Sequence, residues 1–148
     1  MKTKLLTAAF LLLTILACNK DKFQTTPTLE VKNLNTKEVV PNSNLEIKME
    51  YTDKEGDLGD GTLTYIRIRT NFFPIPNPSL YDKVDTIKSA VPGFPVNSKG
   101  EILLTIPYNF MDEDPNRNDT MFFKITVKDI RNNSSDTIST ATVVAKQN

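Results

Sequence analysis

The sequence predicts an all-β fold, a two-sheet antiparallel sandwich of about seven short strands. Apolar residues recur at every second position from Leu45 to Tyr51 and from Phe123 to Val127, and this period of two is typical of half-buried strands. After residue 17, no stretch carries apolar residues at i, i+3, i+4 and i+7 over three turns, the pattern of an amphipathic helix. The length of 148 residues indicates one domain.

Turn signals rich in Pro, Asn, Asp and Gly separate the predicted strands. The strand at 62–69 has an imperfect phase, because Ile66 and Ile68 share one face opposite Arg67 and Arg69 while Tyr65 is out of step. A bulge near Tyr65, or burial of both faces, would explain this. In chain order, the strands are expected to begin near 29, at 45, at 62, near 83, at 101, at 123 and at 137.

Residues 1–17 have the features of a signal peptide rather than of the fold. Lys2 and Lys4 precede an apolar run of about a dozen residues, which is too short to span a bilayer but fits a secretory signal. The chain's only cysteine, Cys18, follows Ala17 directly. An ordinary signal peptide that happens to end near a cysteine is the alternative.

This N-terminus resembles a bacterial lipoprotein signal, which implies that Cys18 is lipidated (palmitate among its acyl chains) and becomes the first mature residue. Several acyl chains on one cysteine give stable membrane anchoring. We therefore expect residues 18–27 to be a polar tether and residues 28–148 to be the sandwich domain. The expected location is the cell outer membrane, on either its periplasmic or its surface face.

The loop between the second and third of these strands combines four acids with three glycines. Clustered carboxylates on a glycine-rich loop suit Ca²⁺, which takes six to eight oxygen ligands. In the predicted topology the turn at Asp129 shares a pole with this loop. The favoured interpretation of the same residues is a solvated turn without metal, and calcium is the alternative. The candidate calcium ligands are Asp53, Glu55, Asp57, Asp60 and Asp129.

A second acidic cluster lies between the strands that begin at 101 and 123, and we expect it to be a solvated loop at the opposite pole. Its members are Asp112, Glu113, Asp114 and Asp119. Residues 70–100 hold five of the nine prolines and suit an irregular, edge-like excursion. Phe72 and Phe73 in this excursion either form an exposed binding patch or pack the loop onto the sandwich, and packing is the favoured expectation.

Composition excludes several classes of function. Eighteen basic and 18 acidic residues cancel, so no large field indicates nucleic-acid binding. The absence of histidine and the single cysteine remove the commonest general base and the thiolate zinc clusters. No catalytic residue is therefore predicted, and the protein is not expected to be an enzyme.

Two segments carry a resemblance to known proteins. Asp53-Lys-Glu-Gly-Asp57 followed by Leu63-Thr-Tyr65 resembles the junction of the second and third strands in cadherin-like and Ig-like bacterial modules. The sequence from Phe123 to Ser134 resembles their last hairpin. Together with the lipid signal, the chain is similar to small uncharacterised lipoproteins of the Bacteroidetes type. This resemblance implies an Ig-like fold and an envelope address but no activity.

Three Asp-Thr-aliphatic triplets resemble the O-glycosylation acceptor of that lineage, which implies Thr86, Thr120 and Thr137 as candidate acceptors. The leading hypothesis is a lipid-anchored cell-envelope protein with a non-catalytic Ig-like module that binds a protein or glycan, either with or without structural calcium at the acidic loop. The alternative is a structural or assembly subunit of an outer-membrane complex whose sandwich edge pairs with a partner strand. A small glycan hydrolase is the least favoured hypothesis.

Overall fold

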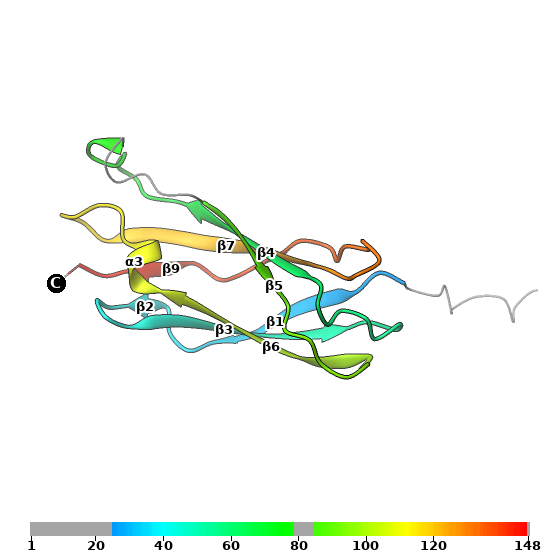
Figure 1. Ribbon diagram of the computed structural model, residues 1–148. Helices are drawn as coiled ribbons and strands as arrows, with labels where there is room; N and C mark the ends of the chain where they lie inside the picture. The colour runs from blue at the N-terminus through cyan, green and yellow to red at the C-terminus, as the bar shows by residue number, and fades with distance from the viewer. Residues whose placement is uncertain (1–24, 79–84, 148) are drawn as a thin grey trace, which may run out of the picture.

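The computed structural model describes residues 25–78 and 85–147. The predicted signal peptide and Cys18 lie outside the described residues. Within them, the all-β prediction is confirmed: two sheets stack face to face, and the single helix, α3 (Tyr108–Met111), has one turn (Figure 1). In the part of the chain that the structure describes, no helix has the length and apolar character needed to cross a membrane.

The first sheet has three antiparallel strands in the order β1-β3-β6. They are β1 (Thr28–Leu34), β3 (Asn44–Thr52) and β6 (Lys99–Pro107). β1 enters the sandwich at Thr28, which pairs with Thr52 at the last position of β3. β3 and β6 pair over nine consecutive residues without a shift in register.

The second sheet has the order β2-β9-β7-β4-β5, and β8 also pairs with β7. Its pairs are antiparallel except for the parallel pair of β2 with β9. The division of strands between the two sheets is that of an Ig-like sandwich. The strands are β2 (Glu38–Val39), β4 (Thr62–Arg69), β5 (Thr86–Ala90), β7 (Asp119–Lys128), β8 (Ile138–Ser139) and β9 (Val143–Ala145).

The core fills the space between the sheets with the inward residues of β3 and β7. Leu45, Ile47 and Met49 are fully buried on β3. The same alternation holds on β7, as the period of two predicts: Met121, Phe123, Ile125 and Val127 are fully buried.

β4 differs from the prediction in which face is buried. Leu63, Tyr65 and Arg67 point into the sandwich, and Ile66 and Ile68 lie half-buried on the outer face. The pairing of β4 with β7 continues over eight residues without a shift, so the bulge proposed near Tyr65 is absent. The prediction was wrong because it assumed that arginine faces solvent, whereas Arg67 is buried and its charge is paired.

The predicted last strand at 137–145 is divided into β8 and β9. Thr140 lies between them and is buried. Its backbone N–H donates to Phe123 O at 2.9 Å, and its hydroxyl oxygen accepts the Phe123 N–H at 3.0 Å. The Thr140 hydroxyl therefore takes the place of a backbone carbonyl as the acceptor of the Phe123 N–H. Threonine side chains can compete in this way with the backbone hydrogen bonds of a sheet.

Candidate functional site

Two loops meet at one pole of the sandwich, which we call the acidic pole: the β3–β4 loop (53–61) and the turn after β7 (129–133). They meet because Thr62, the first residue of β4, pairs with Lys128, the last residue of β7. Gly61 lets the backbones touch, since a Cβ at this position would lie 2.3 Å from Lys128 O. The Ile130 N–H also points to Asp57 O at 3.5 Å.

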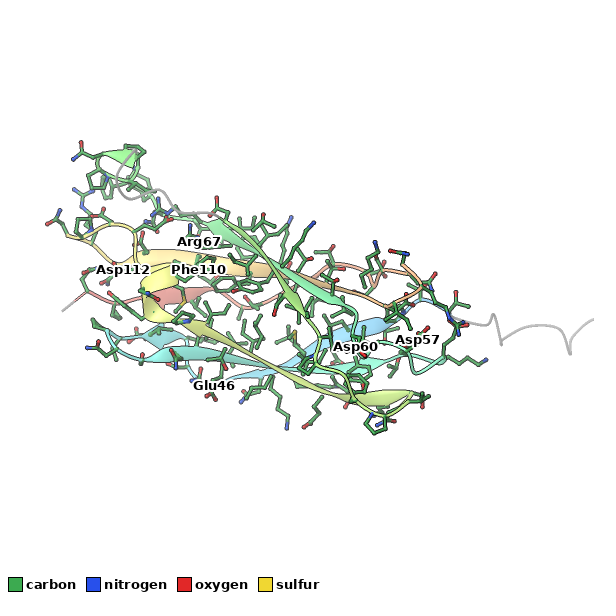
Figure 2. All side chains as sticks on the ribbon, viewed as in Figure 1. Glu46, Asp57, Asp60, Arg67, Phe110 and Asp112 are labelled. Carbon is green, nitrogen blue, oxygen red and sulfur yellow. The ribbon has the colours of Figure 1, made fainter. Side chains whose placement is uncertain are left out.

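Three of the five predicted ligands converge at this pole. Glu55, Asp57 and Asp129 each offer a carboxylate oxygen within 4.8 Å of the others. Asp57 lies at the end of the molecule where the β3–β4 loop closes (Figure 2). The expectation that the Asp129 turn shares a pole with the acidic loop is therefore confirmed.

The other two predicted ligands are directed elsewhere. Asp53 is buried, and its carboxylate oxygens accept the backbone N–H groups of Glu55 at 3.3 Å and Asp57 at 2.8 Å. It therefore shapes the loop. Asp60 is exposed with φ at 61°, and its carboxylate lies over the β5–β6 connection, where a Cβ on Gly93 would be 2.8 Å from its Oδ1.

Sequence reasoning missed Arg131, which belongs to the same site. Its Nη1 lies 2.8 Å from Glu55 Oε1, and its Nε lies 2.9 Å from Asp57 Oδ2. The side chain is 60% exposed, so water screens these pairs. The signal in the sequence was an arginine two residues after Asp129, on the turn already expected at this pole.

Glu55, Asp57 and Asp129 lie together at this pole, and Arg131 pairs with the first two of them. Glu55 Oε2 and both Asp57 oxygens are buried atoms without a hydrogen bond, since Asp57 Oδ2 is near Arg131 Nε but not in a hydrogen-bonding direction. Burial, followed by the neighbouring Asp129 charge, raises the Asp57 pKa above its usual value of 3.8, against the opposing effect of Arg131. Asp129 is held in place by Asn133, whose backbone and side-chain N–H groups both donate to it at 2.8 Å.

The second acidic cluster lies at the opposite end of the molecule, where Figure 2 labels Arg67, Phe110 and Asp112. The prediction of a solvated loop was wrong for most of it, because Glu113, Asp114 and Asp119 are buried. Glu113 and Asp119 pair with Arg67 and Arg69 of β4, and the Asp114 carboxylate accepts the Asn116 backbone N–H at 3.0 Å. The charges that sequence patterning assigned to solvent therefore form a network inside the sandwich.

Arg67 is the centre of this network, with no exposed side-chain surface. Its Nε and Nη2 donate to Asp85 Oδ1 at 3.0 and 2.8 Å, Nη1 donates to Phe110 O, and Nη2 also pairs with Glu113. The guanidinium lies over the Phe110 ring at 4.9 Å. A fully buried charge with this many partners fixes α3 and the following segment against β4.

Asp119 completes the network from β7. Arg69 Nη2 pairs with Glu113 at 2.6 Å and with Asp119 at 2.8 Å. Asp119 also accepts the backbone N–H groups of Glu113 and Asp114 at 2.6 and 2.8 Å. Two guanidiniums meet three carboxylates here, and among the described residues none of these carboxylate oxygens is buried without a partner, so the cluster is a structural network rather than an open site.

The aromatic residues of the 70–78 loop are exposed, which contradicts the expectation that they pack onto the sandwich. Phe72 is 91% exposed and Phe73 is 53% exposed, with their ring centres 5.0 Å apart. Arg117 covers one face of Phe73 at 4.4 Å. A hollow of about 250 Å³ lies beside these rings and is also lined by Asn71 and Asn118.

The three candidate O-glycosylation residues differ in exposure. Thr86 at the start of β5 and Thr137 before β8 are exposed. Thr120 is half-buried within β7, and its backbone N–H donates to Asn71 Oδ1. Modification of these residues stays a prediction.

No protein-family model matches the chain, and no curated protein matches it. Among solved structures, the chain is similar to a Niemann-Pick type C2 protein from the Japanese carpenter ant, with 9% identity and a TM-score of 0.39. The match covers 81% of this chain and 89% of that chain. A similarity this low carries no argument about function, which therefore rests on the residues.

Replacing Arg67 with leucine should cost about 3–5 kcal/mol of unfolding free energy, because it removes one of the two guanidinium partners of the buried Glu113 and the donor to Phe110 O. Lys48→Met is the matched control, since Lys48 pairs with Glu101 at 2.9 Å on the surface and such a pair contributes about 0–1 kcal/mol. Urea unfolding measures both. Equal losses in the two variants would contradict a structural role for the buried network.

Asp57→Asn should stabilise the metal-free protein relative to wild type at pH 7, and this advantage should shrink as the pH falls toward 3.8. Between pH 3.8 and the raised pKa of Asp57, the folded state keeps a proton that the unfolded state has released. The unfolding free energy of the wild type therefore falls as pH rises through this range. Urea unfolding in EDTA at several pH values checks this. Asp60→Asn, which removes an exposed charge from the same loop, is the control, and a pH-independent Asp57→Asn effect would contradict the assignment.

Proposed function

We propose that this protein is a lipid-anchored cell-envelope protein, that its β-sandwich is a non-catalytic binding module, and that Ca²⁺ binds at the acidic pole. The observation that carries the calcium proposal is the convergence of Glu55, Asp57 and Asp129 with buried oxygens that accept no hydrogen bond. Buried carboxylate oxygens are costly unless a cation or donor satisfies them.

The oxygen chemistry of the pole suits a hard cation. Three carboxylates supply part of the six to eight oxygens that Ca²⁺ takes, and water fills the remaining positions in many such sites. Glu55 and Asp57 now face Arg131, so the cation would displace an exposed guanidinium whose binding is weak. Calcium would then join the β3–β4 loop to the β7 turn and stiffen this end of the sandwich.

The path of the chain supports an orientation for the anchored protein. Thr28 pairs with Thr52, so the domain begins beside the acidic pole. Cys18 precedes Thr28 by ten residues, which reach at most about 35 Å when extended. With Cys18 in the outer membrane, the tether would join the domain at the acidic pole, and the Phe72–Phe73 loop would be at the end away from the tether (Figure 1), on either the periplasmic or the surface side.

This orientation makes the Phe72–Phe73 loop the favoured contact region for a protein or glycan partner. Exposed aromatic side chains supply contact area, and exposed apolar patches mark interaction surfaces. Asn71 beside them is fixed by Asp119, to which its Nδ2 donates at 2.6 Å. A second candidate function, a subunit of an outer-membrane complex, is favoured by the open edge of β6.

Calcium should raise the melting temperature of residues 19–148 by several degrees. A ligand at 100 times its Kd stabilises a protein by about 2.7 kcal/mol, and a domain of this size gains a few degrees for each kcal/mol. Asp57→Asn should lose the effect and Asp60→Asn should keep it. Superimposable melting curves in millimolar calcium and in EDTA would contradict the metal proposal and indicate that the acidic loop is a turn without bound metal.

Cys18→Ser should move the full-length protein from the membrane fraction to the soluble fraction of the native host. The reason is that the hydroxyl cannot take the thioether-linked lipid or its further acyl chains, and stable anchoring needs more than one chain. Cell fractionation and intact mass of the native protein measure this. A membrane-bound Cys18→Ser variant, or a wild-type mass without lipid, would contradict the anchor.

A further inference from the structure

β6 is an open edge of the three-stranded sheet. Within the described residues it pairs with β3 alone, through nine consecutive pairs from Lys99 to Pro107 (Figure 1). Every second backbone N–H and C=O of an edge strand faces away from its neighbour. β6 therefore presents a row of backbone donors and acceptors along the side of the sandwich.

The other edge strands carry features that discourage pairing with a further strand. β1 has a register shift between Val31 and Asn33 with Lys32 at that point. β2 has only two residues, and β5 has five with Lys88 at its centre. These edges are protected by a bulge, by shortness and by charge.

The middle of β6 has none of these protections. Residues 102–106 (Ile-Leu-Leu-Thr-Ile) contain no charge and no proline, and their pairing with β3 has no bulge. Leu103 is 60% exposed on the outer face. Such a segment promotes strand pairing unless something covers it.

An apolar groove runs beside this edge, between β5 and β6. Its volume is about 300 Å³, and it is lined by Leu63, Val91, Pro92, Ile102, Leu103 and Leu104 among others. Leu63 and Val91 at its base are buried residues of the core. The unpaired backbone edge of β6 and the apolar groove therefore lie along the same strand.

We propose that the β6 edge binds an extended segment of a partner polypeptide, which adds as a strand and places alternate apolar side chains in the groove beside β5. The outward N–H and C=O groups of β6 favour a peptide as the ligand. An extended peptide has donors and acceptors at the same spacing, whereas an acyl chain can form no hydrogen bonds with them. Strand addition gives affinity through the backbone and specificity through alternate side chains. This inference gives the proposed binding module a second contact region, apart from the Phe72–Phe73 loop, names the partner class that fits it, and rests on that proposed function.

The test selects peptides from a displayed library of random nonapeptides against residues 19–148. We expect enriched peptides with apolar residues at every second position. The best one should bind at least tenfold more weakly to Leu103→Lys, which puts a charge on the edge without entering the core. Val40→Lys is the matched control, because Val40 is 52% exposed and lies outside the edge and groove, and this variant should bind normally.

A synthetic peptide with alternate backbone N-methyl groups should fail to bind, and the parent peptide should slow amide exchange within residues 102–106. Circular dichroism confirms that both variants fold. The proposal would be overturned if the N-methylated peptide bound equally well, if amide exchange were unchanged, or if no peptide were enriched. Dimerisation of the protein through β6 that excludes peptide would also overturn it. Because the Cys18 and calcium experiments do not involve β6, failure here is distinguishable from failure of the proposed function.

Discussion

The antiparallel pairing of β4 with β7 is the constraint on which the rest of the structure depends. Its eight pairs run from Thr62 with Lys128 to Arg69 with Met121. The first pair brings the acidic loop and the Asp129 turn to one pole. The last pair places Arg69 within reach of Asp119 at the other. A slip of one residue would turn Leu63 and Tyr65 outward and separate both groups of charges.

The two poles handle charge differently, and this difference separates structure from candidate function. At the Arg67 end, Arg67 and Arg69 pair with Glu113 and Asp119 inside the sandwich, and the network holds α3 and β4 together. At the acidic pole, Glu55 and Asp57 share the exposed Arg131, and three of their buried oxygens accept no hydrogen bond. Oxygens of this kind gain from an added cation.

The sequence predicted the fold well because alternation reports burial directly on β3, β6 and β7. It also predicted that the Asp129 turn meets the acidic loop, since this follows from Ig-like connectivity. Burial of Arg67 could not be predicted from alternation, because its partners Asp85, Phe110 and Glu113 are brought to it by long-range contacts. Asp53 was counted as a ligand for a different reason: acidic composition alone does not show that its carboxylate accepts hydrogen bonds from the loop's own backbone.

A cation at the acidic pole would compete with Arg131 for the same oxygens. Calorimetric titration of calcium into residues 19–148 and into Arg131→Ala measures this competition. We expect wild type to bind one ion and Arg131→Ala to bind it more tightly, because Glu55 and Asp57 lose their competing partner. No heat of binding in either protein, or weaker binding by Arg131→Ala, would contradict it.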